Sequence, residues 1–85
     1  MGPYRISEKE EISYNEFTWN KRYNLLFVDN PCGVGYSTVN PGQEVTNEKD
    51  MARQLYNALQ DFFVQHPQYK LNDFYVFGES YGKII

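Results

Sequence analysis

The sequence predicts an α/β fold in which two strands are joined through a loop and a helix. Three observations support this: a continuous apolar run at 24–29, a helical repeat of apolar residues at 47–66, and a second β-prone run at 74–77. A strand, a crossover helix and a second strand form a right-handed βαβ unit, and an open sheet is implied. The motif at 78–82 directly follows the second run, and ligands bind at that end of such sheets.

The composition is that of a packed globular segment. Of the 85 residues, 41% are hydrophobic and 18% are aromatic, which argues against disorder. The net charge of −3 shows no basic patch, so we expect no nucleic acid partner. No apolar stretch approaches the ~20 residues that cross a bilayer, so we expect no membrane partner. The oligomeric state stays open.

The first twenty residues are polar and weakly patterned, with a charge cluster at 8–11. A solvated loop or a short edge hairpin is predicted here. We expect Phe17 and Trp19 to anchor this segment to the core beside Tyr23.

The run Asn24–Asp29 has the length of a strand buried on both faces, as in a parallel sheet, and Pro31 helps to end it. The loop that follows, 30–46, is long for a connection inside a compact domain, and loops of this length are usually functional or disordered. Gly33 and Gly35 resemble the start of a dinucleotide-binding fingerprint. Thr38 stands where the third glycine belongs, so that interpretation fails.

A helix is predicted from Asn47 to His66. Its apolar side chains fall on one face: Met51, Leu55, Ala58, Leu59, Phe62 and Phe63. Thr46 or Asn47 can cap its start, and Pro67 stops it. His66, the one histidine, lies at the end of the helix that runs away from the sheet's active edge, so we do not assign it as a catalytic base.

Cys32 is the one cysteine, and it cannot form an internal disulfide. It is either a half-buried loop thiol or the partner of a cysteine outside this segment. Nothing beside it supplies a metal site, and we expect no metal and no cofactor.

The motif Gly78-Glu79-Ser80-Tyr81-Gly82 reads as G-x-S-x-G, the nucleophile elbow. Gly78 and Gly82 allow backbone to approach backbone in a turn between a strand and a helix. The turn exposes the Ser80 Oγ, and the backbone N–H of Tyr81 points to where an oxyanion forms. The motif predicts acyl transfer through a serine ester; an ordinary Gly-Ser turn after a strand is the alternative.

Several segments resemble the serine carboxypeptidases, and together they span nearly the whole chain. They are Trp19–Lys21, Asn24–Asp29, Gly33–Ser37, Phe62-Phe63, His66–Tyr69 and Phe74–Tyr81. Glutamate before the serine and tyrosine after it are far more specific than G-x-S-x-G alone.

The resemblance implies an α/β-hydrolase fold and removal of C-terminal residues from peptide or protein substrates, generally at acidic pH. Such enzymes are usually secretory, vacuolar or lysosomal. By position, Ser80 matches the nucleophile and Tyr81 the backbone oxyanion donor. Glu79 matches the residue that holds the substrate's terminal carboxylate, and this contact requires a shared proton because like charges repel.

Parts of the family pattern are absent from the sequence. These are the glycine-rich oxyanion loop, an acidic partner for Glu79, and the Asp and His of the triad; the pattern after Gly82 also departs from the family. We therefore expect residues 1–85 to be a fragment of a single α/β-hydrolase domain, incomplete and inactive alone. Two alternatives stay open: an acyltransferase on the same scaffold, and a non-catalytic pseudoenzyme or interaction fragment. The substrate side-chain preference is also open.

Overall fold

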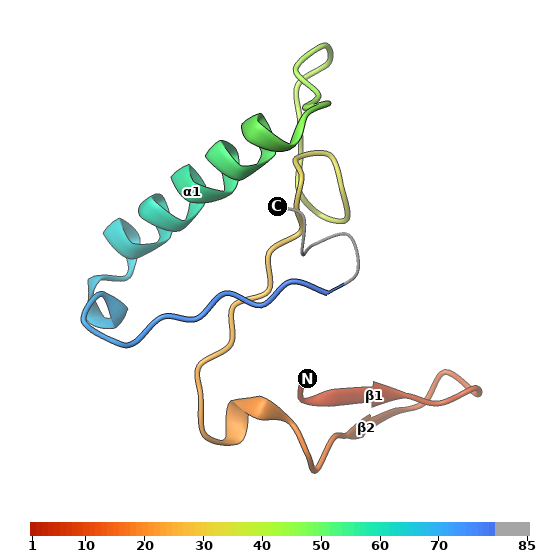
Figure 1. Cartoon of the computed structure of the whole chain (residues 1–85). Coiled ribbons are helices and arrows are strands. Elements are labelled where there is room, and N and C mark those ends of the chain that lie inside the picture. Colours follow the sequence, from red (N-terminus) through yellow and green to blue (C-terminus); the bar gives the residue numbers. More distant parts are fainter. Residues whose placement is uncertain (80–85) are drawn as a thin grey trace.

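The computed structural model describes residues 1–79 and consists of a hairpin, one long helix and extended connections (Figure 1). The elements in chain order are β1 (Tyr4–Ile6), β2 (Ile12–Tyr14), the 3₁₀ helix η1 (Trp19–Lys21), α1 (Glu48–Gln65) and the 3₁₀ helix η2 (Pro67–Tyr69). The radius of gyration is 15.4 Å, against about 12 Å for a compact domain of this length. Among the described residues only Met51 and Asn15 are buried, so the chain encloses very little core.

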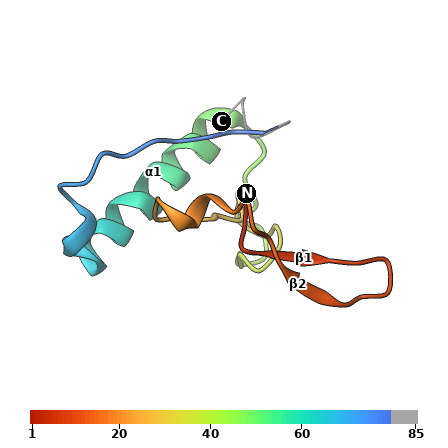
Figure 2. The same cartoon turned by 90° about the horizontal axis from the view of Figure 1, so that it is seen from below.

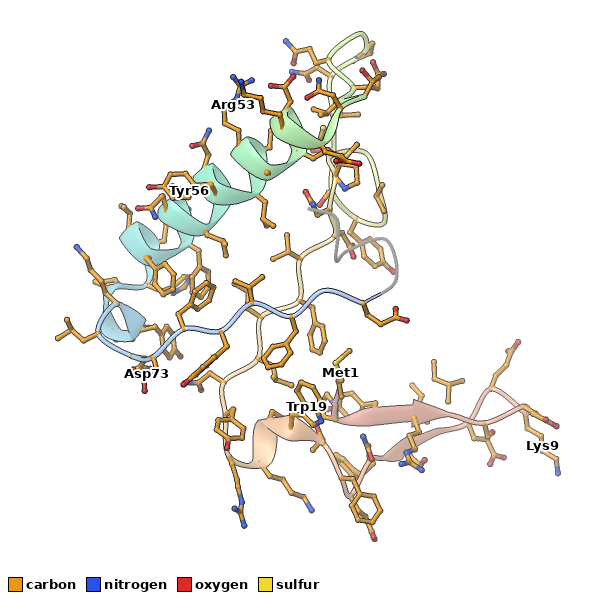
Figure 3. The ribbon with its side chains drawn as sticks, viewed as in Figure 1. Met1, Lys9, Trp19, Arg53, Tyr56 and Asp73 are labelled. Atoms are coloured by element: carbon orange, nitrogen blue, oxygen red, sulfur yellow. The ribbon has the colours of Figure 1, made fainter. Side chains whose placement is uncertain are left out.

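The hairpin is the second of the two forms predicted for the first twenty residues. β1 and β2 pair antiparallel, with Tyr4 opposite Tyr14, Arg5 opposite Ser13 and Ile6 opposite Ile12. The Ser7 Oγ closes the turn by accepting the backbone N–H of Lys9 at 3.2 Å and of Glu11 at 3.1 Å. Lys9 lies at the tip, which projects away from the rest of the chain (Figure 3).

Asn15 fixes the base of the hairpin. Its side-chain amide donates to the Gly2 carbonyl at 2.9 Å, and its Oδ1 accepts the Phe17 N–H at 3.1 Å. A buried amide is tolerated because both of its polar ends are satisfied. The Trp19 N–H donates to the Met1 carbonyl at 3.0 Å, so the start of the chain and η1 lie together (Figure 3).

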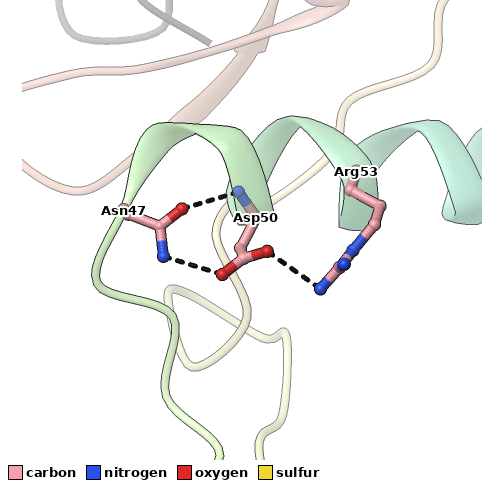
Figure 4. Close-up of polar contacts among 3 residues, drawn as sticks. All are labelled: Asn47, Asp50 and Arg53. Carbon is pink, nitrogen blue, oxygen red and sulfur yellow. Dashed lines mark hydrogen bonds and ion pairs between the residues drawn. The ribbon is translucent and has the colours of Figure 1, made fainter.

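The helix α1 confirms the predicted helical segment, and its cap is Asn47. The Asn47 Oδ1 accepts the Asp50 N–H at 2.9 Å, while its Nδ2 donates to the Asp50 carboxylate at 2.7 Å (Figure 4). The same carboxylate pairs with Arg53 at 2.9 Å. The cap satisfies an N–H that the first turn leaves free, and the negative charge favours the positive end of the helix dipole. At the other end, Pro67 opens η2 instead of continuing the helix.

The apolar face of α1 is turned toward the rest of the chain. Met51 is buried, and Leu55, Leu59, Phe62 and Phe63 are half-buried, whereas Ala58 is exposed. Arg53 and Tyr56 lie on the outer face (Figure 3). The predicted apolar face is therefore confirmed, except at Ala58.

The two predicted strands, 24–29 and 74–77, run as extended chain but are not paired. In Figure 1 the segment after η2 crosses the segment after η1 in the projection, where paired strands would run beside one another. A strand exists only where its N–H and C=O groups meet those of a neighbour, and within residues 1–79 the only paired strands are β1 and β2. Two strands joined by a right-handed crossover belong to one sheet but need not be neighbours in it. The local pattern therefore did not say which strand pairs with 24–29 or with 74–77.

Of the two aromatic residues expected to anchor the first twenty residues beside Tyr23, only Trp19 makes such a contact, with Phe77. Phe17 is 79% exposed and Tyr23 is 70% exposed. Phe17 lies in the tight turn that follows Asn15, where the hydrogen bonds of the turn direct the backbone and the ring meets no core.

Figure 2, the view from below, shows how the hairpin projects from the remainder of the chain and leaves little to pack against it. We expect the isolated 85-residue chain to lack cooperative tertiary structure, because burial at this size barely offsets chain entropy. Near-UV circular dichroism combined with urea denaturation measures this. A monomer that unfolds in one sharp transition from a state with fixed aromatic signals would contradict the expectation.

Candidate functional site

The predicted elbow follows the extended segment Phe74–Phe77. Gly78 and Glu79 are exposed at its end. Ser80, Tyr81 and Gly82 lie outside the described residues, so their predicted roles rest on the sequence. The structure instead shows what holds the segment that leads to them.

The start of this segment is held by the helix. The ring of Phe74 meets that of Phe63 on α1 edge to face, with centroids 5.3 Å apart and planes at 86°. Phe63 makes a second edge contact, with Phe62, at 5.3 Å. Edge-to-face pairs place the positive ring edge on the negative ring face, which adds to the gain from burial.

The end of the segment is held from elsewhere in the chain. The ring of Phe77 meets that of Trp19 in η1, with centroids 5.6 Å apart and planes at 70°. Successive side chains of an extended chain point to opposite faces, so Phe74 and Phe77 project in opposite directions. The approach to the elbow is therefore held by α1 on one face and by η1 on the other.

A further aromatic group closes the turn between α1 and η2. Phe62 lies 4.8 Å from the His66 ring and 6.3 Å from the Tyr69 ring, the latter nearly parallel at 17°. The backbone N–H of His66 also donates to the backbone carbonyl of Phe62 at 2.8 Å. His66 thus takes part in packing the end of the helix.

Asp29, which the sequence analysis did not single out, organises the loop after the first extended segment. Its Oδ2 accepts the Tyr36 N–H at 2.9 Å, and its backbone carbonyl accepts the Ser37 Oγ–H at 2.6 Å. Within the loop, the Gly33 N–H donates to the Ser37 carbonyl at 3.1 Å. The signal in the sequence was a carboxylate a few residues before Gly-x-Gly, since such a side chain can accept backbone N–H groups of a tight loop.

Both loop glycines are required by this geometry. Gly33 and Gly35 have φ values of +85° and +58°. A Cβ at Gly35 would overlap the Asp29 carboxylate, and one at Gly33 would lie 2.9 Å from a Val39 methyl group. The Gly-x-Gly pattern is therefore explained by loop closure around Asp29.

Cys32 is half-buried and unpaired among the described residues. It borders an open hollow of about 480 Å³ with Thr38, Val39, Asn40, Gln43 and Gln54. Over residues 1–79, no group of three or more His, Cys, Asp or Glu side chains is placed to hold a metal ion. In the same part of the chain, no helix has the length and apolar character needed to span a membrane.

Comparison with known proteins decides the family. The model of the family described as "Serine carboxypeptidase" matches residues 1–85, which is the whole chain. The chain belongs to the serine carboxypeptidase family. The resemblance stated from the motifs is thereby confirmed, and the family implies an α/β-hydrolase fold, of which one helix and a two-stranded sheet are consistent with a part.

Similar proteins come from plants, fungi and animals. "Serine carboxypeptidase-like 48" of Arabidopsis thaliana is 43% identical over 82 residues, covering 95% of this chain and 16% of the relative. "Pheromone-processing carboxypeptidase KEX1" of Fusarium vanettenii is 46% identical, covering 96% and 13%. "Probable serine carboxypeptidase CPVL" of Homo sapiens is 44% identical, covering 99% and 18%. No solved structure matches the chain. The chain thus spans less than a fifth of the length of these relatives.

We expect the Phe63–Phe74 contact to be measurable in the full-length protein. A double-mutant cycle with Phe63→Leu and Phe74→Leu should give a coupling of about 1 kcal/mol in the free energy of unfolding. Each single substitution already removes the edge-to-face contact, so the double variant should lose less stability than the sum of the two single variants. Tyr56 lies seven residues before Phe63, about 10 Å along the axis of α1, and its side chain is exposed. The cycle with Tyr56→Leu and Phe74→Leu therefore serves as control and should give no coupling. Equal coupling in the two cycles would refute the contact.

Proposed function

We propose that the protein containing this chain is a serine-type carboxypeptidase that removes C-terminal residues from peptides through an acyl-enzyme on Ser80. The observation that carries the proposal is the family match over the whole chain together with Gly-Glu-Ser-Tyr-Gly directly after an extended apolar segment. In this proposal Ser80 attacks the scissile carbonyl and the Tyr81 N–H stabilises the oxyanion.

The fold proposed for the whole protein is an α/β-hydrolase in which residues 1–85 are a fragment of one domain. The segments 24–29 and 74–77 become strands of its parallel sheet once neighbouring strands supply hydrogen-bonding partners. Two findings support this: the apolar side chains of both segments are exposed, with Phe77 at 75%, and the relatives are several times longer than the chain. The remaining catalytic groups, a triad Asp and His and an oxyanion loop, would come from the rest of the protein.

The substrate proposed is the C-terminus of a peptide or protein. In this proposal Glu79, which is exposed at the end of its segment, receives the terminal carboxylate. We place the enzyme in the secretory pathway, in a vacuole or lysosome or outside the cell, as the resemblance implies. One relative, from Apis mellifera and 43% identical, is a "Venom serine carboxypeptidase", which is in keeping with a secreted enzyme.

Ser80→Ala in the full-length protein should abolish turnover and leave substrate binding largely intact. Without Oγ no acyl-enzyme forms, and loss of triad function costs on the order of 10⁶-fold in kcat. A serine-directed fluorophosphonate should label the wild type and not the variant. Labelling that persists in the variant would move the nucleophile to another residue, and a wild type that is not labelled at all would favour the non-catalytic alternative.

Glu79→Gln should alter the pH profile more than the maximal rate. In the wild type the two carboxyl groups share a proton, so KM for a peptide acid should rise as the pH rises and that proton is lost. Glutamine keeps the shape and always offers an N–H donor, so KM should rise less steeply. The matched peptide amide, which has no carboxylate, is the control and should distinguish the two enzymes little. Parallel profiles of kcat/KM against pH on the acid would leave Glu79 as a structural residue of the elbow.

A further inference from the structure

The loop 30–37 has a defined backbone although it belongs to no helix or strand. Beyond the contacts of Asp29, the Val34 N–H donates to the Pro31 carbonyl at 3.2 Å and the Ser37 N–H donates to the Val34 carbonyl at 3.0 Å. Bonds from both ends therefore close the loop on itself. Its conformation does not depend on a partner for those groups.

The loop presents its apolar side chains to solvent. Tyr36 has its N–H held by Asp29 and its side chain 98% exposed. Val34, two residues earlier, is also exposed. Residues 30–43 contain no charged side chain, so the surface offered by this loop suits an uncharged, apolar group.

The loop and the elbow each follow the carboxyl end of an extended segment joined by the same crossover helix. If both segments enter one parallel sheet, as proposed above, their carboxyl ends lie at the same edge, where ligands bind. Glu79, assigned to the substrate's terminal carboxylate, directly precedes Ser80. The loop 30–37 is then available to the part of the substrate on the other side of the scissile bond.

We propose that Tyr36 is a specificity-determining residue that contacts the side chain of the penultimate substrate residue, and that Asp29 is its positioning residue. This inference rests on the proposed carboxypeptidase function. The ring of Tyr36 offers a broad apolar face to a large apolar or aromatic substrate side chain. Asp29 acts only through the loop backbone, by holding the Tyr36 N–H.

The test compares two peptides that differ only at the penultimate position, phenylalanine or glycine, with the full-length enzyme. Tyr36→Ala should lower kcat/KM about tenfold for the phenylalanine peptide and less than about twofold for the glycine peptide. Tyr36→Phe, which keeps the ring, should preserve the preference. Tyr56→Ala, which removes an exposed tyrosine from the outer face of α1, is the matched control and should change neither value.

Asp29 is tested in the same assay by two substitutions. Asp29→Ala should reproduce the selective loss on the phenylalanine peptide, mainly through KM. Asp29→Asn, whose amide oxygen can still accept the Tyr36 N–H, should restore the preference. If Asp29→Ala does not fold, Tyr36→Ala and Asp29→Asn still decide whether the loop selects the substrate.

Two results would overturn the inference: equal losses on both peptides in Tyr36→Ala, with or without a lowered Tm, or an unchanged preference. Fluorophosphonate labelling of Ser80 separates this failure from failure of the proposed function. Labelling together with an unchanged preference removes only the role of Tyr36. An absence of labelling removes the carboxypeptidase assignment itself.

Discussion

The aromatic contacts of Phe74 and Phe77 are what hold the approach to the elbow in place. Phe74 contacts Phe63 of α1 and Phe77 contacts Trp19 of η1, on opposite faces of one extended segment. Each such contact is worth about 0.5–1.5 kcal/mol, whereas ordering one residue of backbone costs about 1–2 kcal/mol. Two ring contacts therefore set the direction of a four-residue segment without fixing its backbone. In the α/β-hydrolase fold proposed above, hydrogen bonds from neighbouring strands would supply the remainder, so the predicted elbow would depend on a completed sheet.

The loop after the segment 24–29 is held in its conformation by hydrogen bonds instead of aromatic contacts. Asp29 places its carboxylate where the Tyr36 N–H needs an acceptor, and its carbonyl receives the Ser37 hydroxyl. The first of these bonds is charge-assisted, and such bonds are stronger than neutral ones. The loop is consequently closed by residues close in sequence, whereas the segment Phe74–Phe77 relies on distant ones. Of the two candidate parts of the site, the loop is the one that the chain can organise by itself.

This difference also separates what the sequence could predict from what it could not. The helix depends on neighbours within a few residues, and local pattern was sufficient to predict it. Asn47 was one of two predicted caps, and the hairpin one of two predicted forms, and the structure decides both. A strand depends on partners that can lie far along the sequence. The apolar runs at 24–29 and 74–77 predicted extended backbone correctly, whereas within residues 1–79 neither run is paired. Asp29 was missed because an acidic residue at a strand end has many uses, and its role follows from the path of the loop. The roles of Ser80, Tyr81 and Glu79 stay predictions.

Few charged residues lie near the ends of the segments 24–29 and 74–77, and this affects the carboxylate contact proposed for Glu79. Residues 30–43 carry no charge, and in 74–82 Glu79 is the one charged side chain. If the proposed sheet forms and excludes water from this edge, a carboxylate there would have no cation from residues 30–43 or 74–82 to compensate it, and burying an unpaired charge is costly. A second carboxylate, brought by the substrate, raises that cost further unless one proton is held between them. In the proposed site, the uncharged stretches 30–43 and 74–78 would therefore favour a shared-proton contact at Glu79.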